Sequence, residues 1–330
     1  MKHMKFLSFF LGIAFAIIAC SSNNETIPAP EVDPDGDDGT TEVEFAKGAD
    51  IGWVTEYESK GYNFYNAKGE QRECTALMKE LGLDAIRIRV WVDPSKHGNW
   101  CNTADVVEKA KRAKELGMDV MIDFHYSDWW ADPAQQNKPA SWVGKNLVNL
   151  KSAIKDHTVS VLQALKEIGV IPKWVQVGNE IRPGMLWDED VALSGASYNV
   201  TEKDLKDALA SATDKVVYPM NWANLGAFVT TGYDAVKSVF PDAIVIVHLD
   251  NGWDSGLFTW FFDELKKNGG KWDMIGMSLY PYWSRDAKEG YSSADAVITD
   301  CISNIKALST KYNCDVMVVE TGMECADDNG

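Results

Sequence analysis

Two glutamates that follow short β-rich segments could act together as a pair of catalytic carboxylates. Glu180 follows residues 174–177, and Glu320 follows residues 316–319, 140 positions further along the chain. When two such groups face each other across a glycosidic bond, a protonated carboxyl can donate to the leaving oxygen while a carboxylate attacks the anomeric carbon. Mutual repulsion would help to keep the acid protonated. The pair therefore indicates glycoside hydrolysis, provided that the fold brings both residues to one site.

The residues near these glutamates have both functional and structural interpretations. A single glutamate at a strand end belongs to a structural ion pair more often than to a catalytic site. Two of them, with Asn179 beside one, favour catalysis. Asn179 is placed to bind the 2-hydroxyl of a sugar, or else it is a turn residue. Arg89 is expected to keep Glu320 ionised, or else to form an ion pair in the core.

A repeated unit would position these side chains: an amphipathic stretch, a Gly or Asn that ends it, and a short continuous apolar run. Continuous β-branched runs are typical of parallel strands that are covered on both faces. No Gly-rich phosphate loop follows the first run, and functional residues follow nearly every run, so a closed barrel is favoured over a doubly wound sheet. We predict an α/β fold of the (β/α)8 TIM-barrel type, with strands near residues 49–53, 85–90, 120–124, 174–177, 244–248, 274–277 and 316–319.

A barrel closed by eight strands requires one more unit than these seven runs provide. The seventh run ends eleven residues before Gly330. We therefore expect the barrel domain, residues 46–330, to be truncated before its eighth strand. The ends of strands four and seven face each other across the mouth of such a barrel, which would bring Glu180 close to Glu320.

Several strand-end motifs resemble those of the retaining barrel glycosidases called clan A. Asn179 with Glu180 is similar to the strand-four motif of the clan, and Glu320 is similar to its strand-seven glutamate. Within the clan, the chain from about residue 46 to 330 resembles the arabinogalactan endo-β-1,4-galactanases of glycoside hydrolase family 53. The segments that carry this resemblance are residues 48–51, 87–91, 123–133, 176–180 and 279–283.

The resemblance implies internal cleavage of β-1,4-linked galactan, the side chain of type I arabinogalactan, with retention of configuration. In this double displacement Glu180 is the acid/base and Glu320 is the nucleophile, and no cofactor takes part in catalysis. Two alternatives stay open: another clan A endoglycanase, such as a mannanase or glucanase, and a non-catalytic glycan-binding lipoprotein.

The resemblance also assigns roles to polar residues at other strand ends. Tyr280 is expected to donate its phenol hydrogen to Glu320. Sugar binding is expected of His125, His248 and Asp128, although each histidine could be structural and Asp128 could cap a loop.

Tryptophan and acidic loop residues complete the predicted site. The chain has 13 Trp residues, and flat aromatic rings pack well on the apolar faces of sugars. Trp130 and Trp253 are expected to form such platforms. Some members of the family carry a structural calcium in the loop after the nucleophile, where Asp328 could be a ligand; a solvated acidic loop is the alternative.

The N-terminus has the features of a bacterial lipoprotein signal. Lys2 and Lys5 precede an apolar run over residues 6–19, and Cys20 follows a small residue. This pattern predicts a signal peptide over residues 1–20 that is cleaved before a lipid-modified cysteine, or else an uncleaved anchor. In both cases the remaining chain is exported and attached to a bacterial membrane.

Charge and cysteine content limit the possible partners. Residues 21–45 form a predicted flexible linker, because residues 21–44 hold eight acidic side chains and no Lys or Arg. The formal net charge of −17 disfavours nucleic acid and anionic polymers, so charge alone predicts a neutral polymer or a small molecule as the partner. With the family resemblance, the expected partner is the galactan polysaccharide, and the protein is expected to be a monomer. The five cysteines after Cys20 are an odd number, and no disulfide pairing is predicted.

Overall fold

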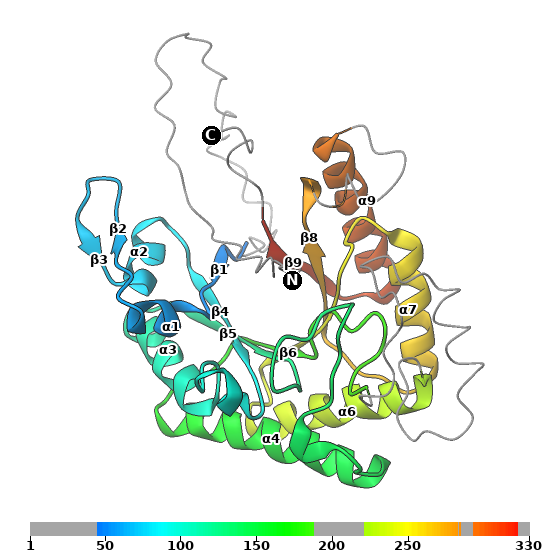
Figure 1. Ribbon diagram of the computed structural model, residues 1–330. Coiled ribbons are helices and arrows are strands. Elements are labelled where there is room, and N and C mark those ends of the chain that lie inside the picture. Colours follow the sequence, from blue (N-terminus) through cyan, green and yellow to red (C-terminus); the bar gives the residue numbers. More distant parts are fainter. Residues whose placement is uncertain (1–44, 188–220, 283, 285–292, 323–330) are drawn as a thin grey trace, which may run out of the picture. The chain divides into compact units, whose positions relative to one another are not determined.

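The computed structural model describes residues 45–187, 221–282, 284 and 293–322 (Figure 1). The predicted lipid attachment at Cys20, most of the predicted linker and the predicted calcium ligand Asp328 lie outside these residues. Residues 47–323 form one unit, which carries the strands and helices that the structure describes.

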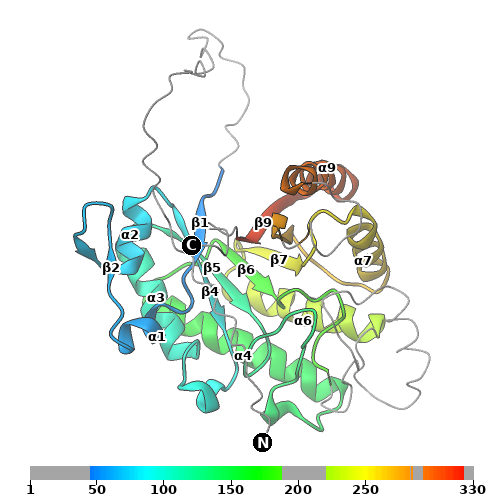
Figure 2. The same cartoon turned by 45° about the horizontal axis from the view of Figure 1, so that its top comes forward.

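The core of this unit is a parallel sheet of seven strands. Neighbours in the sheet are neighbours along the chain, and every pair is parallel (Figure 2). Seven parallel strands in chain order, with helices in the connections, form a nearly closed barrel that matches the (β/α)8 TIM-barrel fold. The fold class and all seven predicted strands are confirmed. The strands are β1 (Gly48–Asp50), β4 (Ala85–Val90), β5 (Asp119–Phe124), β6 (Trp174–Val177), β7 (Ile244–Leu249), β8 (Met274–Leu279) and β9 (Asp315–Thr321).

Helices cover the outer face of the sheet, and short-range sequence signals define their ends. In α4, buried Leu150, Ile154 and Leu165 share one face because they recur at helical spacing. Its N-cap Asn146 accepts a hydrogen bond from the Asn149 amide. The helices are α1 (Val54–Ser59), α2 (Cys74–Glu80), α3 (Thr103–Glu115), α4 (Leu147–Glu167), α6 (Trp222–Val239), α7 (Ser255–Lys267) and α9 (Ala294–Tyr312).

Smaller elements lie in the connections. Two 3-10 helices, η1 (Pro94–His97) and η2 (Ala140–Trp142), follow β4 and β5, and a hairpin of β2 (Phe64–Tyr65) and β3 (Gln71–Arg72) follows α1. Among the described helices, none combines the length and apolar character that a bilayer crossing requires. The four cysteines in the described part of the chain are not in disulfides.

A tight turn after β6 carries the first predicted catalytic residue. Gly178 has a φ of +83°, and a Cβ there would lie 2.5 Å from the Ile181 side chain, so only glycine fits. Glu180 itself has a φ of +49°, which is unusual for a residue with a side chain. The side-chain amide of Gln136 donates to the main-chain oxygens of Asn179, at 2.8 Å, and Glu180, at 3.3 Å. The strained turn is thus held from the loop after β5.

A register shift between β8 and β9 positions the second glutamate. Pairing changes between Met277 and Ser278, so that Ser278 pairs with Glu320. Bulges of this kind change the direction of side chains next to active sites. Because the strands are parallel, the carboxyl ends of β8 and β9 lie at the same end of the barrel as Glu180, and the shift sets Ser278 opposite Glu320 there.

Candidate active site

The predicted carboxylate pair meets at the carboxyl ends of the strands. An oxygen of Glu180 and an oxygen of Glu320 lie within 4.8 Å of each other, together with a ring nitrogen of His248. Glu180 is 9% exposed, while the side chain of Glu320 is 25% exposed. A small, partly open site thus contains both carboxyl groups, although 140 positions separate them in sequence.

The environment of Glu180 favours the protonated form of this carboxyl. Burial, followed by the negative charges of Glu320 and Asp250, raises the pKa of Glu180 well above its ordinary value. A hydrogen bond from Ser278 acts in the opposite direction. The raised pKa favours the protonated form of Glu180, which is the form that a general acid requires.

Arg87, and not Arg89, contacts Glu320. Arg87 Nη1 lies 3.1 Å from Glu320 Oε2 and 2.8 Å from Asp50 Oδ2. Its other terminal nitrogen lies 2.9 Å from Asp123 Oδ2. The guanidinium is thus the central cation among three carboxylates.

Arg89, which was predicted to keep Glu320 ionised, instead forms the core ion pair that was its alternative interpretation. Arg89 Nη1 lies 3.5 Å from Asp50, and the guanidinium stacks 4.1 Å from the centre of the Trp130 ring. Arg87 and Arg89 share one face of β4 because strand side chains alternate. Arg89 is closer to the carboxyl end of the strand, where it meets the loop after β5 and not β9. Periodicity alone could not distinguish the two arginines.

The second oxygen of Glu320 is bound by Tyr280. The phenol Oη of Tyr280 donates to Glu320 Oε1 over 2.6 Å, as the family resemblance implied. Burial and the neighbouring negative charge of Glu320 raise the pKa of the phenol, so Tyr280 keeps its hydrogen. Arg87 and Tyr280 therefore fix the orientation of the carboxylate from both sides.

Both predicted sugar-binding histidines are buried and bonded to other side chains of the protein. His125 Nε2 lies 2.9 Å from Asp123, and His125 Nδ1 accepts from the Ala131 amide. His248 is fully buried and uses its nitrogens toward Gln176 and Ser278. In both rings, each nitrogen has a partner within the protein, which is the structural alternative that the sequence left open, and sugar binding by these histidines stays a prediction. The imidazole of His248 lies beside the two glutamates, and both imidazoles fix neighbouring side chains through their hydrogen bonds.

Asn179 connects the two halves of this buried layer. Its Oδ1 accepts from Arg87 at 2.8 Å, and its Nδ2 donates to the main-chain oxygen of Ala131 at 2.8 Å. Asn179 is 4% exposed. These bonds fix the side-chain amide of Asn179 beside Glu180. The second hydrogen on Nδ2 is not used in either of these two bonds.

The predicted sugar ligand Asp128 caps a loop. Its Oδ1 accepts from the Asp93 amide at 2.9 Å, and its Oδ2 accepts from the Ala140 amide at 2.8 Å. Both oxygens therefore order the connections after β4 and β5. A loop cap was the alternative interpretation of Asp128 from the sequence, and these two hydrogen bonds from backbone amides agree with it.

The two predicted tryptophan platforms differ in exposure. Trp130 is 39% exposed and has the Arg89 guanidinium against its ring. Trp253 is 8% exposed and packs in the hydrophobic core. Only Trp130 of the two offers a substantial ring surface for a sugar.

A second buried ion pair was not predicted from sequence. Arg182 and Asp250 form two hydrogen bonds of 2.9 Å, and both side chains follow the strands that flank the site, β6 and β7. Asp250 also contributes to the raised pKa of Glu180. The sequence signal was available, since both residues lie two positions beyond other predicted site residues, Glu180 and His248.

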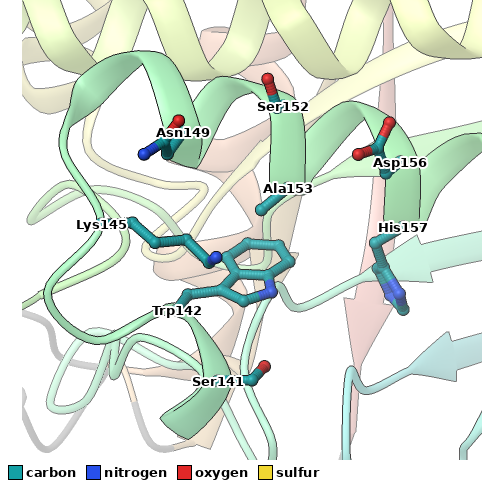
Figure 3. Close-up of a pocket in the computed structure, with 8 residues that line it drawn as sticks. All are labelled: Ser141, Trp142, Lys145, Asn149, Ser152, Ala153, Asp156 and His157. Atoms are coloured by element: carbon teal, nitrogen blue, oxygen red, sulfur yellow. The ribbon is translucent and has the colours of Figure 1, made fainter.

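A separate groove lies outside the carboxylate site. It has a volume of about 400 Å³ between η2 and α4, where the indole of Trp142 lies beside Ala153 and His157 (Figure 3). Burial lowers the pKa of His157 to about 4, so this imidazole is neutral. None of the residues that line the groove belongs to the site around Glu180 and Glu320.

The cluster of Glu180, His248 and Glu320 is a poor metal site despite its compactness. The Arg87 guanidinium lies on Glu320, and His248 is committed to hydrogen bonds with its neighbours. A divalent cation would have to displace these contacts and face the charge of Arg87. The described residues of the site thus favour acid-base and nucleophilic chemistry.

Comparison with known proteins identifies the family. The sequence pattern of the family described as glycosyl hydrolase family 53 matches residues 46–330. The chain belongs to glycosyl hydrolase family 53. The resemblance predicted from the strand-end motifs is confirmed over the same residues, and membership of family 53 makes the chain a glycoside hydrolase.

Family 53 relatives include named galactanases. The chain is 36% identical over 280 residues to an uncharacterised protein of Niallia circulans. This match covers 85% of this chain and 68% of that protein. It is 31% identical over 281 residues to the arabinogalactan endo-β-1,4-galactanase of Thermothelomyces thermophilus, with 83% and 73% covered. A solved structure of a fungal β-1,4-galactanase is 30% identical with a TM-score of 0.71, and the match covers 86% of this chain and 76% of that one.

Proposed function

We propose that this chain is a retaining endo-β-1,4-galactanase that cleaves the galactan of type I arabinogalactan. The observation that carries the proposal is the carboxylate pair Glu180 and Glu320, whose oxygens lie within 4.8 Å of each other in a family 53 barrel. Retaining glycosidases have carboxyl groups about 5–5.5 Å apart, whereas inverting enzymes need about 6.5–9.5 Å to admit a water. The short separation supports retention.

In the first step, Glu320 attacks the anomeric carbon while Glu180 protonates the leaving oxygen. The bond to the leaving sugar breaks, and a glycosyl ester forms on Glu320. The bonds from Arg87 and Tyr280 hold one carboxylate oxygen each, so the nucleophile approaches in a fixed orientation. The raised pKa of Glu180 supplies the proton.

In the second step, Glu180 works as a base. Having lost its proton, the carboxylate accepts one from a water molecule, and the water oxygen attacks the anomeric carbon of the ester. Glu320 leaves as a carboxylate, and its negative charge is again balanced by Arg87. Two inversions give net retention.

The surface near the site fits a neutral sugar chain. Trp130 offers an exposed ring, and its stacking on Arg89 limits ring motion. The high acidic content of the chain does not favour an anionic polymer. The relatives named as galactanases support galactan over mannan or glucan as the substrate.

A hydrolysis assay tests this function. We expect the purified protein to release reducing ends from galactan, with little release from mannan or cellulose. Proton NMR of the first product should show the β-anomer before mutarotation, because retention preserves configuration.

Glu180→Gln and Glu320→Gln should each lower turnover by about a thousandfold or more. Full activity in either variant would remove that residue from the mechanism.

We also infer that the chain is exported and held to a membrane by a lipid on Cys20. The support is the sequence pattern of a basic start, a short apolar run and a cysteine after a small residue. Growth of an expressing bacterium with a labelled fatty acid tests it. Wild-type protein should carry the label and Cys20→Ala should not; label on both would contradict the assignment.

A further inference from the structure

A chain of three hydrogen-bonded side chains leads from Glu180 into the barrel. Ser278 Oγ donates to Glu180 Oε1 over 2.6 Å, and His248 Nε2 lies 2.8 Å from the same serine oxygen. On the other side of the imidazole, Gln176 Nε2 lies 3.0 Å from His248 Nδ1. Ser278 and Gln176 are almost completely buried, and His248 is fully buried. Water therefore does not compete for these bonds.

The number of hydrogens on each of these side chains determines which group donates in each hydrogen bond. Ser278 has a single hydroxyl hydrogen, which it gives to Glu180, so the serine oxygen accepts from His248 Nε2–H. Burial lowers the pKa of His248 well below its ordinary value, so the ring is neutral and Nδ1 is an acceptor. Gln176 donates to it, and the same amide nitrogen lies 3.1 Å from Asn179 Oδ1. A neutral histidine with hydrogen on Nε2 thus satisfies Ser278 and Gln176, while Asn179 Oδ1, which lies 3.1 Å from Nδ1, accepts from Arg87 instead.

The two oxygens of Glu180 are consequently not equivalent. Oε1 receives the hydroxyl of Ser278, while Oε2 receives no hydrogen bond from the part of the chain that the structure describes. In a protonated carboxyl, the carbonyl oxygen is the better acceptor and the other oxygen carries the hydrogen. A donor fixed on Oε1 therefore favours the proton on Oε2, the oxygen that is free to meet a leaving group.

We propose that Ser278, oriented by His248, is a positioning residue that directs the transferable proton of Glu180 to Oε2. The proposal rests on the acid/base role of Glu180 in the proposed function. In the first step the proton leaves from Oε2 to the departing sugar oxygen, and in the second step Oε2 takes a proton from water. Oε1 keeps its bond to Ser278 throughout, so the carboxyl does not have to rotate between steps.

The fold contains a specific device for this bond. The shift in pairing between Met277 and Ser278 changes the direction in which Ser278 points at the end of β8. The strained main chain of Glu180, held by Gln136, brings the glutamate toward it. Two local irregularities, on β8 and after β6, thus converge on one 2.6 Å hydrogen bond.

Infrared spectroscopy tests the bond without any substrate. The difference between wild type and Glu180→Gln isolates the carbonyl stretch of protonated Glu180. In Ser278→Ala this band should move to higher frequency, because the carbonyl oxygen loses its donor. Ser278→Thr keeps a hydroxyl and should leave the band near its wild-type position. An unchanged band in Ser278→Ala would overturn the proposal.

Kinetics on galactan provide the second test. Ser278→Ala should lower kcat/KM by about ten- to a hundredfold, mainly through kcat. Activity requires protonated Glu180 and is lost as pH rises through its pKa. The Ser278 bond lowers that pKa, so its removal should move the alkaline limb of the pH profile to higher pH. A purely structural serine would lower activity without moving the limb, and that result would contradict the proposal.

Control variants separate this effect from general damage. Ser278→Thr should recover most of the activity and the wild-type alkaline limb. Ser238→Ala removes a hydroxyl that bonds Ala235 within α6, and it should change neither quantity. Absence of galactan hydrolysis by the wild-type protein would refute the proposed function, while the infrared band would still decide whether Ser278 bonds the carbonyl oxygen of Glu180.

Discussion

The guanidinium of Arg87 lies 3.1 Å from the carboxylate of Glu320, and the arginine side chain is 7% exposed. The same guanidinium binds Asp50 and Asp123, so one buried cation balances three carboxylates. A buried charge is tolerated when it is paired, and removal of one partner leaves the others uncompensated. Nucleophile orientation and barrel stability are therefore linked through a single residue.

Substitution of Arg87 should affect both catalysis and stability. Arg87→Lys keeps the charge but loses the planar fork, so we expect kcat on galactan to fall by about a hundredfold and the unfolding free energy to fall by about 2–4 kcal/mol. Arg89→Lys is the matched control on the same strand face. It should lower kcat by less than about tenfold, because Arg89 contacts Asp50 and Trp130 and not Glu320. Equal losses in the two variants would argue against a specific role of Arg87. Steady-state kinetics and thermal melts measure these effects.

Removal of the Tyr280 hydroxyl should slow the reaction with little effect on the fold. Tyr280→Phe keeps the ring but leaves Glu320 Oε1 without its 2.6 Å donor. We expect kcat to fall by about ten- to a hundredfold while the melting temperature changes by only about 2 °C. Tyr233→Phe removes a phenol that bonds Asp273 away from the site and serves as a control. A Tyr280→Phe enzyme with wild-type kcat would show that Arg87 alone orients the nucleophile.

The raised pKa of Glu180 should make stability depend on pH. The folded state holds this proton more tightly than the unfolded chain, so the stabilisation is complete below the ordinary pKa and is lost as pH rises through the folded value. Glu180→Gln cannot ionise and escapes this loss. We expect the variant to melt about 2–4 °C above wild type near pH 9, with a smaller difference near pH 5. Calorimetry at both pH values measures the difference, and a gain that does not depend on pH would exclude Glu180 as its source.

Trp130 should contribute to substrate binding more than to chemistry. Trp130→Ala removes an exposed ring, so we expect KM for galactan to rise by about tenfold with kcat nearly unchanged. Ile171→Ala, at an exposed apolar residue, is a control that should leave KM unchanged. A fall in kcat with constant KM would instead place Trp130 close to the reacting bond.

The sequence by itself determined the order of the elements and the catalytic pair. Continuous apolar runs and helix-ending Gly or Asn residues are local signals, and they predicted all seven strands. The topology of a parallel barrel then required the ends of strands four and seven to converge. The sequence alone therefore pairs Glu180 with Glu320, and the motifs around them indicate the family.

Only the tertiary structure decided which neighbours contact that pair. Arg87 and Arg89 have the same residue type and the same strand face, so their roles depend on which strand end or loop lies opposite each of them. His125, His248 and Asp128 have residue types that suit sugar binding, but their hydrogen bonds go to the protein. Ser278 gave no sequence signal, because its direction depends on a register shift between two strands. Side-chain partners depend on long-range packing, whereas strand and helix patterns depend on residues only a few positions apart.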